Sequence, residues 1–467
     1  MHLSASALPT LPAAIHSPRY DRSTHAPGVV HLGLGAFHRA HQAMVFDQLL
    51  AGGDPRWGIH GVGMTRPDLV NQLRAQDGLY AVRVADGQGV KWHVPGALWR
   101  THVATTERDA VVQAIADPAT RWVTLTVTEK GYTAALGQLL LDGLRLRAQQ
   151  GLPGLTVASC DNLQGNGHKL KALVTAAATD QDAAVLRWLD GHCAFPCSMV
   201  DRIVPAATPE VLAAAQEALG VPDACALSTE GFWEWVIEDH FADPADGPLL
   251  QSAGVRVTRD VHSYEEAKLR MLNGSHSAMA LMGAITGRPY IASCIGVEHI
   301  RAFVHRLMGR EVSPHLSRSD WSDYREALIA RFGNPYLKHS VHQIATDSSQ
   351  KIPQRWPPSV LGQMANNASF EHHALAAAVL VRYTLGVDEQ GHAYTLNDPQ
   401  ADRLLALGAA QRTEPEACVR AILAREDLWG STLPSRTAWI NRVTHWHQQV
   451  LQHGVDASVA QLLAQEP

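Results

Sequence analysis

The order of secondary-structure patterns along the chain constrains its fold more than any other feature. From residue 29, short runs rich in Val, Thr and Leu alternate with amphipathic stretches of helical period. Such alternation predicts a parallel β-sheet with helices on both faces. The predicted strands cover 29–32, 58–62, 122–128 and 155–158, and the predicted helices between them cover 40–50 and 136–149.

The pattern changes after about residue 260, where strand-like runs are nearly absent. A chain of 467 residues is long enough for more than one hydrophobic core. We therefore predict two domains, an α/β domain over 1–260 and an all-α domain over 261–467. Helices in the second domain are expected at 264–286, 295–308, 321–332, 370–386, 401–410, 415–424 and 436–451.

Charge and composition exclude several classes of partner. The 39 basic and 45 acidic residues give a net charge of −6, so there is no basic excess to bind nucleic acid. No run of 18 apolar residues occurs, and the first residues lack the basic start of a signal peptide. Six scattered cysteines do not form a disulfide framework. We expect a cytoplasmic protein that binds neither nucleic acid nor membrane, as a monomer or a small homo-oligomer.

A glycine-containing turn follows the first predicted strand. A turn between a strand and a helix lets backbone N–H groups and the helix dipole face a pyrophosphate. His38 stands where the third glycine of a dinucleotide fingerprint would be, so a tight turn without a ligand is the alternative. The residues predicted to bind the cofactor here are Gly33, Leu34, Gly35, Ala36 and Phe37.

Asp68 follows the second predicted strand and favours NAD as the cofactor. A carboxylate at this place can accept hydrogen bonds from the hydroxyls of the adenosine ribose. Its distance from Gly33 is 35 residues, longer than the usual spacing of about 20. Arg66 lies nearby and could instead bind the 2′-phosphate of NADP. We predict NAD, with Asp68 as its ribose ligand.

Lys268 begins a pattern suited to alcohol oxidation. Lysine is rare, with seven residues against 32 arginines. At about 100° per residue of an α-helix, Asn273 and His276 lie about 140° and 80° around the axis from Lys268, so all three can line one wall. A desolvated lysine can act as a base, while Asn and His donate to the developing alkoxide. The alternative is a surface lysine, a capping asparagine and a core histidine.

Histidine pairs raise the question of a metal-dependent alcohol dehydrogenase. His38 and His41 would share one face of a helix, whereas His445 and His447 would not. Neither pair has a Cys or carboxylate at a recognisable ligand spacing, and the pair of Cys193 with the nearby Cys197 has no second pair to complete a zinc site. We predict that the protein holds no metal.

Several segments together resemble the mannitol dehydrogenase family of long-chain polyol and sugar-acid dehydrogenases. The resemblance implies a Rossmann-type NAD-binding domain, a C-terminal helical domain like that of 6-phosphogluconate dehydrogenase, an active site between them, and metal-independent chemistry. The matching segments are HLGLGAFHRAHQA (31–43), TLTVTEKGY (124–132), SCDNLQGNG (159–167), FPCSMVDRIVPAATPE (195–210), FWEWVIEDHF (232–241), KLRMLNGSHS (268–277) and SSQKIPQR (348–355).

The resemblance also implies roles for individual residues. Lys268 matches the general base of the family, and Asn273 and His276 match ligands of the substrate oxygen. Glu265 matches a carboxylate that passes protons between the lysine and solvent. Further residues that match the substrate site are Asn162, Asp201 and Lys351.

Within the family, the segments KLRMLNGSHS, SQKIPQR and RYTLGVDEQG are most similar to fructuronate reductases (D-mannonate oxidoreductases). Gln343 stands where mannitol dehydrogenases tend to carry Arg. Arg270 and Arg355 could hold a sugar-acid carboxylate, although Arg270 lies about 200° around a helix from Lys268 and could face away. We predict NAD-dependent interconversion of D-mannonate and D-fructuronate. The alternatives are a polyol 2-dehydrogenase acting on D-mannitol or D-arabinitol and, less favoured, a non-catalytic dinucleotide-binding protein.

Overall fold

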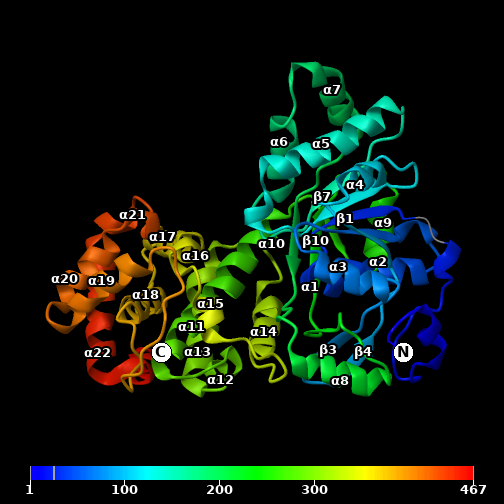
Figure 1. Ribbon diagram of the computed structural model, residues 1–467. Coiled ribbons are helices and arrows are strands. Elements are labelled where there is room, and N and C mark those ends of the chain that lie inside the picture. The colour runs from blue at the N-terminus through cyan, green and yellow to red at the C-terminus, as the bar shows by residue number, and fades with distance from the viewer. Residues whose placement is uncertain (1, 25–26, 466–467) are drawn as a thin grey trace. The chain divides into compact units, whose positions relative to one another are not determined.

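The computed structural model describes residues 2–24 and 27–465. The chain forms two compact units, unit 1 over Met1–His262 and unit 2 over Ser263–Pro467 (Figure 1). All three β-sheets belong to unit 1. In the described part of unit 2, extended pairing is limited to the isolated bridges of Tyr290 with Ser340 and of Val387 with Ala393. The predicted fold class, an α/β region followed by an all-α region, is confirmed.

The central sheet of unit 1 has five parallel strands in the order β5-β2-β1-β6-β7. Val29 of β1 pairs with Ile59 of β2 on one side and with Trp122 of β6 on the other. The predicted strands all belong to this sheet. The fifth strand of the sheet, β5, was not predicted. The strands of the sheet are β1 Val29–Leu32, β2 Ile59–Gly63, β5 Leu98–Val103, β6 Trp122–Leu125 and β7 Thr156–Ser159.

Helices cover both faces of the central sheet, as the alternation predicted (Figure 1). Successive side chains of a strand point to opposite faces, so Val29 and Val30 belong to different cores. The first core includes residues of α2 and α9, and the second includes residues of α4, α5 and α6. The α-helices of unit 1 are α1 Ala36–Ala40, α2 Gln42–Ala51, α3 Pro67–Ala75, α4 Arg108–Ile115, α5 Ala134–Gln149, α6 Asn166–Ala176, α7 Ala183–His192, α8 Pro209–Leu219 and α9 Asp246–Ser252.

Strand β6 ends three residues earlier than predicted. The N–H of Thr126 still donates to the carbonyl of Leu32 at 2.9 Å, and its hydroxyl donates to the carbonyl of Gly33 at 2.8 Å. The next two N–H groups, of Val127 and Thr128, donate to the carboxylate of Asp161 at 3.2 and 2.7 Å. These bonds replace strand pairing and tie the loop after β6 to the loops after β1 and β7.

Two small three-stranded sheets were not predicted. One, in the order β4-β3-β9, contains an antiparallel hairpin, and the other has the order β11-β10-β8. Their strands are three to five residues long, too short to give a clear alternating pattern in the sequence. They are β3 Val82–Asp86, β4 Gly89–His93, β8 Ser198–Asp201, β9 Leu227–Thr229, β10 Glu234–Glu238 and β11 Arg256–Thr258.

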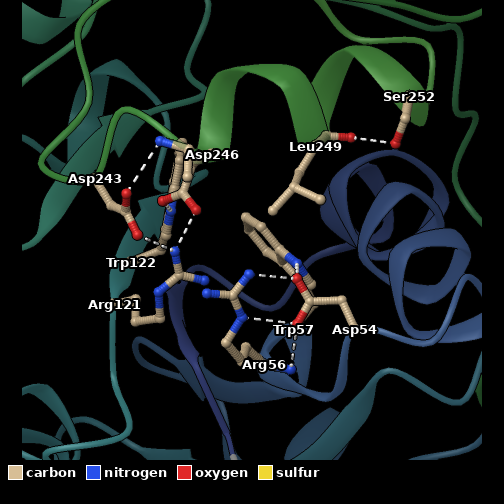
Figure 2. A network of polar contacts seen from close by, with 10 residues as sticks. Asp54, Arg56, Trp57, Arg121, Trp122, Asp243, Asp246, Leu249 and Ser252 are labelled. Carbon is tan, nitrogen blue, oxygen red and sulfur yellow. Dashed lines mark hydrogen bonds and ion pairs between the residues drawn. The ribbon is translucent and has the colours of Figure 1, made fainter.

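A polar network fixes the start of β6 against α9. Asp246 accepts a hydrogen bond from the indole N–H of Trp122 at 2.7 Å and forms an ion pair with Arg121 (Figure 2). The indole of Trp57 donates in the same way to Asp54, at 2.9 Å. Each of these two buried indoles therefore has a carboxylate acceptor, which satisfies its N–H inside the core.

Unit 2 is built around two almost completely buried helices, α11 Gly274–Thr286 and α18 Glu371–Tyr383. A helix that is buried all round forms the centre of a helical domain. Helix α22, Thr437–Gln465, packs along α18 and runs well past the predicted end at 451, with a break at Gly454. The other α-helices are α10 His262–Ala267, α12 Ile291–Ile295, α13 Glu298–Arg306, α14 Trp321–Phe332, α15 Val341–Ala345, α16 Ser348–Arg355, α17 Pro357–Ala365, α19 Ala401–Ala409, α20 Pro415–Leu423 and α21 Glu426–Trp429.

Two segments of unit 2 are π-helical, η6 over Lys268–Asn273 and η7 over Leu307–Val312. The helix predicted over 264–286 is therefore α10, η6 and α11 in succession. Side chains from α16 and the residue after it bond to the junction of η6 with α11. Arg355 donates to the carbonyl of Asn273 at 3.0 Å, and Trp356 donates to the carbonyl of Gly274 at 3.1 Å.

All six cysteines carry free thiols. No helix within 2–24 and 27–465 has both the length and the apolar character that a membrane crossing requires.

Candidate functional site

The turn after β1 needs glycine at its first position. Gly33 has a φ of +100°, and a Cβ there would lie 2.2 Å from the carbonyl oxygen of Thr126. The first three N–H groups of the turn donate to backbone carbonyls of the protein. Those of Gly33 and Leu34 donate to the carbonyl of Val62 at 2.9 and 3.2 Å, and that of Gly35 donates to the carbonyl of Gly33 at 2.7 Å. The N–H groups of these three residues thus bond within the turn, and the part of these residues in cofactor binding stays a prediction.

The N–H groups suited to a phosphate come from the first turn of α1. Gly35 is the N-cap, so Ala36, Phe37 and His38 are the first helical residues. N–H groups of a first helical turn have no carbonyl partner within the helix, and the helix dipole adds partial positive charge there. This arrangement fits the pyrophosphate of a dinucleotide.

His38, at the position of the third glycine, packs α1 against β1 through its side chain. Its imidazole stacks on that of His31 in β1, with ring centroids 3.3 Å apart and an interplanar angle of 12°. His31 in turn bonds to the hydroxyls of Thr124 and Thr126 at 2.8 and 2.9 Å. Burial lowers the pKa of His31 to about 3 and that of His38 well below its usual value, so both rings are neutral. The helix thus packs on the strand through a pair of rings, which the sequence pattern did not indicate.

Asp68 lies in the first turn of α3, exposed, five residues after the end of β2. This is the carboxyl end of the strand next to β1, as expected for a ribose ligand. An acidic residue in a first turn also stabilises the helix dipole, so its position alone does not separate the two roles. Its contact with a ribose stays a prediction.

Asn162 and Asp201 follow the ends of two strands of unit 1. Asn162 is exposed in the loop after β7, and Asp201 is the last residue of β8 and is 3% exposed. A neighbouring residue ties the loop after β7 to the start of β8. The side-chain amide of Asn166 donates to the carbonyls of Asp161 and Ser198 at 3.0 and 2.7 Å and accepts from the N–H of Ser198 at 2.9 Å. Sequence reasoning missed Asn166 and the anchoring carboxylate of Asp161.

In unit 2, Lys268 and Asn273 are the first and last residues of η6. The angles predicted for an ideal α-helix do not hold here, because the turns of a π-helix are wider. Single π-helical turns inside α-helices occur frequently at functional sites. Both side chains are half-buried, whereas His276 lies within α11 and is 6% exposed.

His276 is a buried neutral imidazole with an unused nitrogen. Its ring lies 4.6 Å from that of Phe332 and 5.2 Å from that of His339. In the part of the chain that the structure describes, its Nε2 has no hydrogen-bond partner. Burial holds its pKa well below the usual value, and the nearby charges of Arg331, Arg355 and Lys351 lower it further. Such a nitrogen is suited to bond a substrate oxygen.

Two basic side chains predicted to bind the substrate, those of Lys351 and Arg355, donate to carbonyl groups at the ends of helical segments. The ammonium of Lys351 donates to the carbonyl of Ile344 at 3.2 Å and to that of Thr346, which lie at the C-terminal end of α15. Arg355 also donates to the hydroxyl of Ser277 at 2.7 Å, in addition to the carbonyl of Asn273. Arg355 therefore positions the end of η6, next to His276.

Arg270 has protein partners of its own. It forms an ion pair with Glu266 at 2.5 Å and donates to the carbonyl of His315 at 3.1 Å. The guanidinium of Arg270 is therefore bonded to protein groups and needs no substrate carboxylate to balance its charge.

Glu265 lies half-buried in α10, one residue before Glu266. Its part in proton transfer stays a prediction.

The histidines considered above as metal ligands contact different protein groups. His38 stacks on His31, whereas Nε2 of His41 bonds to the carbonyl of Glu234 at 3.0 Å. His447 bonds to the amide of Gln411 at 2.8 Å. Among the described residues, no group of three or more His, Cys, Asp or Glu is arranged to hold a metal ion.

Comparison with known proteins gives matches over both units. Residues 27–246 match the model of the mannitol dehydrogenase Rossmann domain, and residues 260–451 match that of the mannitol dehydrogenase C-terminal domain. D-mannonate oxidoreductase of Escherichia coli (strain K12) is 38% identical, over 95% of this chain and 97% of that protein. Mannitol 2-dehydrogenase of Emericella nidulans is 33% identical, over 94% of each chain.

Solved structures agree. The ternary complex of Pseudomonas fluorescens mannitol 2-dehydrogenase with NAD and D-mannitol is 28% identical and covers all of both chains, with a TM-score of 0.86. A substrate-free D-sorbitol dehydrogenase is also 28% identical, covers 98% of this chain and has a TM-score of 0.88. The predicted family and the predicted class of enzyme are confirmed. The chain belongs to the mannitol dehydrogenase family of oxidoreductases that act on CH–OH groups.

Proposed function

We propose that this protein is an NAD-dependent dehydrogenase that interconverts D-mannonate and D-fructuronate. The observation that carries the proposal is the placement of Lys268 and Asn273 at the two ends of a π-helical turn, followed by a buried neutral His276 with an unused nitrogen. A D-mannonate oxidoreductase that is 38% identical along nearly the whole chain supports the choice of substrate.

Unit 1 binds NAD in this proposal, and bound NAD accepts a hydride from the carbon that carries the hydroxyl. The first-turn N–H groups of Ala36 and Phe37 hold the pyrophosphate, and Asp68 accepts from the ribose hydroxyls. A structural neighbour that is 28% identical and was solved as a ternary complex with NAD and D-mannitol supports this cofactor. The free thiols of all six cysteines support a reducing compartment, the cytoplasm.

Unit 2 supplies the acid–base chemistry in this proposal. Lys268 takes the proton of the substrate hydroxyl during oxidation and returns it during reduction. Asn273 donates to the developing alkoxide, and the Nε2–H tautomer of His276 does the same, which stabilises charge that appears only in the transition state. Glu265 relays the proton between Lys268 and solvent. Arg355 keeps Asn273 in place through its backbone carbonyl.

The positive surroundings of His276 favour an anionic substrate. Lys351, Arg331 and Arg355 all act on its pKa, so a substrate bound beside it lies in a positive potential. A sugar-acid carboxylate gains from this potential, whereas a neutral polyol does not. Asn162, Asp201 and Lys351 bind substrate oxygens in this proposal. Arg355 and Arg270 are the arginines assigned to the carboxylate, and Arg270 would first have to release Glu266.

A polyol substrate is the second candidate. Mannitol 2-dehydrogenase of Emericella nidulans is 33% identical, and the structural neighbour with a TM-score of 0.86 is a mannitol 2-dehydrogenase in complex with D-mannitol and NAD. The same lysine, asparagine and histidine would serve a polyol, since the chemistry at the reacting carbon is unchanged.

The test is NADH formation by the purified protein with NAD and one of D-mannonate, D-mannitol or D-arabinitol. We expect turnover with D-mannonate and at most a small fraction of that rate with either polyol. Turnover of a polyol with none of mannonate would overturn the proposed substrate but not the role of Lys268. No turnover with any of the three would overturn the proposed function.

A further inference from the structure

His339 lies beside His276 but comes from a different part of unit 2. It precedes α15, and its backbone is fixed on both sides. Its N–H donates to the carbonyl of Leu337 at 2.8 Å, and its own carbonyl accepts from Ile291 at 3.0 Å. The imidazole stands edge-on to that of His276, with centroids 5.2 Å apart and an interplanar angle of 88°. Two rigid elements thus bring two imidazoles together.

Both rings have a buried nitrogen without a partner. Within 2–24 and 27–465, neither Nδ1 of His339 nor Nε2 of His276 has a hydrogen-bond partner. Buried polar atoms are nearly always bonded, and leaving one unbonded costs folding free energy. Two such atoms on adjacent rings, in a region that also holds Lys351 and Arg355, indicate a site arranged for a ligand.

The ligand at His339 must match a neutral imidazole. Burial, together with the charge of Lys351, lowers the pKa of His339 to about 4, so the ring is uncharged near neutral pH. A neutral imidazole nitrogen either donates or accepts one hydrogen bond, according to its tautomer. A hydroxyl can do both and is therefore its natural partner, whereas a carboxylate gains more from a charged donor.

We infer that His339 is a second substrate-contacting imidazole, whose Nδ1 bonds the hydroxyl on a carbon next to the one that reacts. In this arrangement His276 bonds the reacting oxygen, and His339 bonds the hydroxyl on the neighbouring carbon. This inference rests on the proposed function and deepens it, because it makes the enzyme specific for vicinal diols. It holds for a sugar acid and for a polyol alike, since both carry neighbouring hydroxyls.

The test pairs a variant with a substrate analogue. His339→Phe keeps a ring of similar size but removes the nitrogen, and His339→Asn returns a polar atom near the place of Nδ1. His342→Asn is the matched control, because His342 is exposed three residues later and its ring contacts Tyr394 instead. Each protein is assayed with the preferred substrate and with its two monodeoxy analogues, which lack a hydroxyl on one side of the reacting carbon or the other.

We expect wild type and His342→Asn to discriminate against one deoxy analogue by about 10- to 100-fold in kcat/KM. His339→Phe should lose about the same factor with the intact substrate, mostly through KM, and should no longer discriminate. His339→Asn should recover part of both. Unchanged discrimination in His339→Phe, with a lowered unfolding temperature alone, would overturn the inference and make His339 a packing residue. If a polyol replaces mannonate as the substrate, the proposed substrate fails, and this test proceeds with the deoxy polyols.

Discussion

The two π-helical segments of unit 2 have the same backbone geometry but opposite polar surroundings. In η7, Glu311 is 1% exposed and fully bonded. One carboxylate oxygen accepts from the N–H and ring Nδ1 of His372 at 2.7 and 2.9 Å, and the other accepts likewise from His373 at 3.0 and 2.6 Å. After η6, by contrast, Nε2 of His276 has no partner among the described residues.

This difference indicates which π-helical segment is structural and which belongs to the site. Glu311 caps the first turn of α18, where a negative charge is favourable, and its hydrogen bonds from His372 and His373 hold its pKa at about 2. Both carboxylate oxygens of Glu311 are therefore occupied by protein donors. After η6, the buried Nε2 of His276 has no hydrogen-bond partner among the described residues and can bond a ligand. The two segments thus differ in the bonding of one buried side chain each, because Glu311 is bonded to the first turn of α18 whereas Nε2 of His276 is unbonded among the described residues.

The largest expected effect is at Lys268. Lys268→Ala should lower kcat by about 10²- to 10⁴-fold, because the substrate hydroxyl loses its general base. The affinity for NADH, measured by fluorescence titration, should stay unchanged. Lys338→Ala, at an exposed lysine of the same unit, is the control and should behave as wild type. A Lys268→Ala enzyme with near-normal turnover would remove the assigned base and with it the contrast between η6 and η7.

Glu311→Gln should have the opposite signature. We expect a loss of about 3 kcal/mol in the free energy of unfolding, because the buried carboxylate is replaced by a group that cannot accept four bonds. The kcat of the folded fraction should stay within about twofold of wild type, since no reacting group is touched. Urea unfolding and steady-state rates measure the two quantities. Glu326→Gln, at an exposed glutamate, is the control. A large fall in kcat at full folding would place η7 in the site.

Asp68→Ala should weaken NADH binding by about 10-fold, the loss of a hydrogen bond to a charged group, and NADPH binding much less. Asp109→Ala is a close control, because Asp109 is exposed at the same second position of α4 as Asp68 is of α3. Both variants lose a similar favourable interaction with a helix dipole. Equal losses for the two dinucleotides would leave Asp68 with a helix-stabilising role only.

The pH dependence of the unfolding free energy should also differ between the wild type and Glu311→Gln. The pKa of Glu311 is about 2 when folded and close to 4.5 when unfolded. A lowered pKa contributes stability that is fully present above 4.5 and is lost as the pH falls toward 2. The gap in unfolding free energy between wild type and Glu311→Gln should therefore narrow by about 1 kcal/mol between pH 7 and pH 4. A gap that widens on acidification would contradict the assignment of a buried charged carboxylate.

The smallest expected effect is that of metal removal. Incubation with EDTA should leave the rate of NADH formation unchanged, since the chemistry proposed for Lys268, Asn273 and His276 requires no Lewis acid. A loss of activity that added zinc restores would contradict the metal-independent mechanism.

The sequence predicted the central sheet well, because its strands are continuous apolar runs buried on both faces, such as Val29–Leu32. It also predicted that the glycine turn joins a strand to a helix and that Lys268 lies in a helical segment. The π-helical turn of η6 could not be predicted, since it depends on Arg355 and Trp356, which lie more than eighty residues later and bond to the carbonyls of Asn273 and Gly274.

The unpredicted residues share a cause. Asp161, Asn166 and His339 act through contacts between segments far apart in the chain, so no local spacing marks them. His38 was considered as a missing glycine and as a metal ligand with His41, but not as a packing residue, because its stacking on His31 exists only once β1 and α1 have packed. Local patterns thus predicted elements and the order of motifs, whereas the supporting contacts of the site arise from tertiary structure.

The most direct test of the account is a crystal structure of the protein with NADH and D-mannonate, an abortive complex that does not react. We predict that Nζ of Lys268, the amide of Asn273 and Nε2 of His276 all lie within hydrogen-bond distance of one hydroxyl of mannonate, with C4 of the nicotinamide facing its carbon. A complex in which Lys268 contacts no substrate oxygen, or in which Nε2 of His276 bonds only to protein atoms, would contradict it.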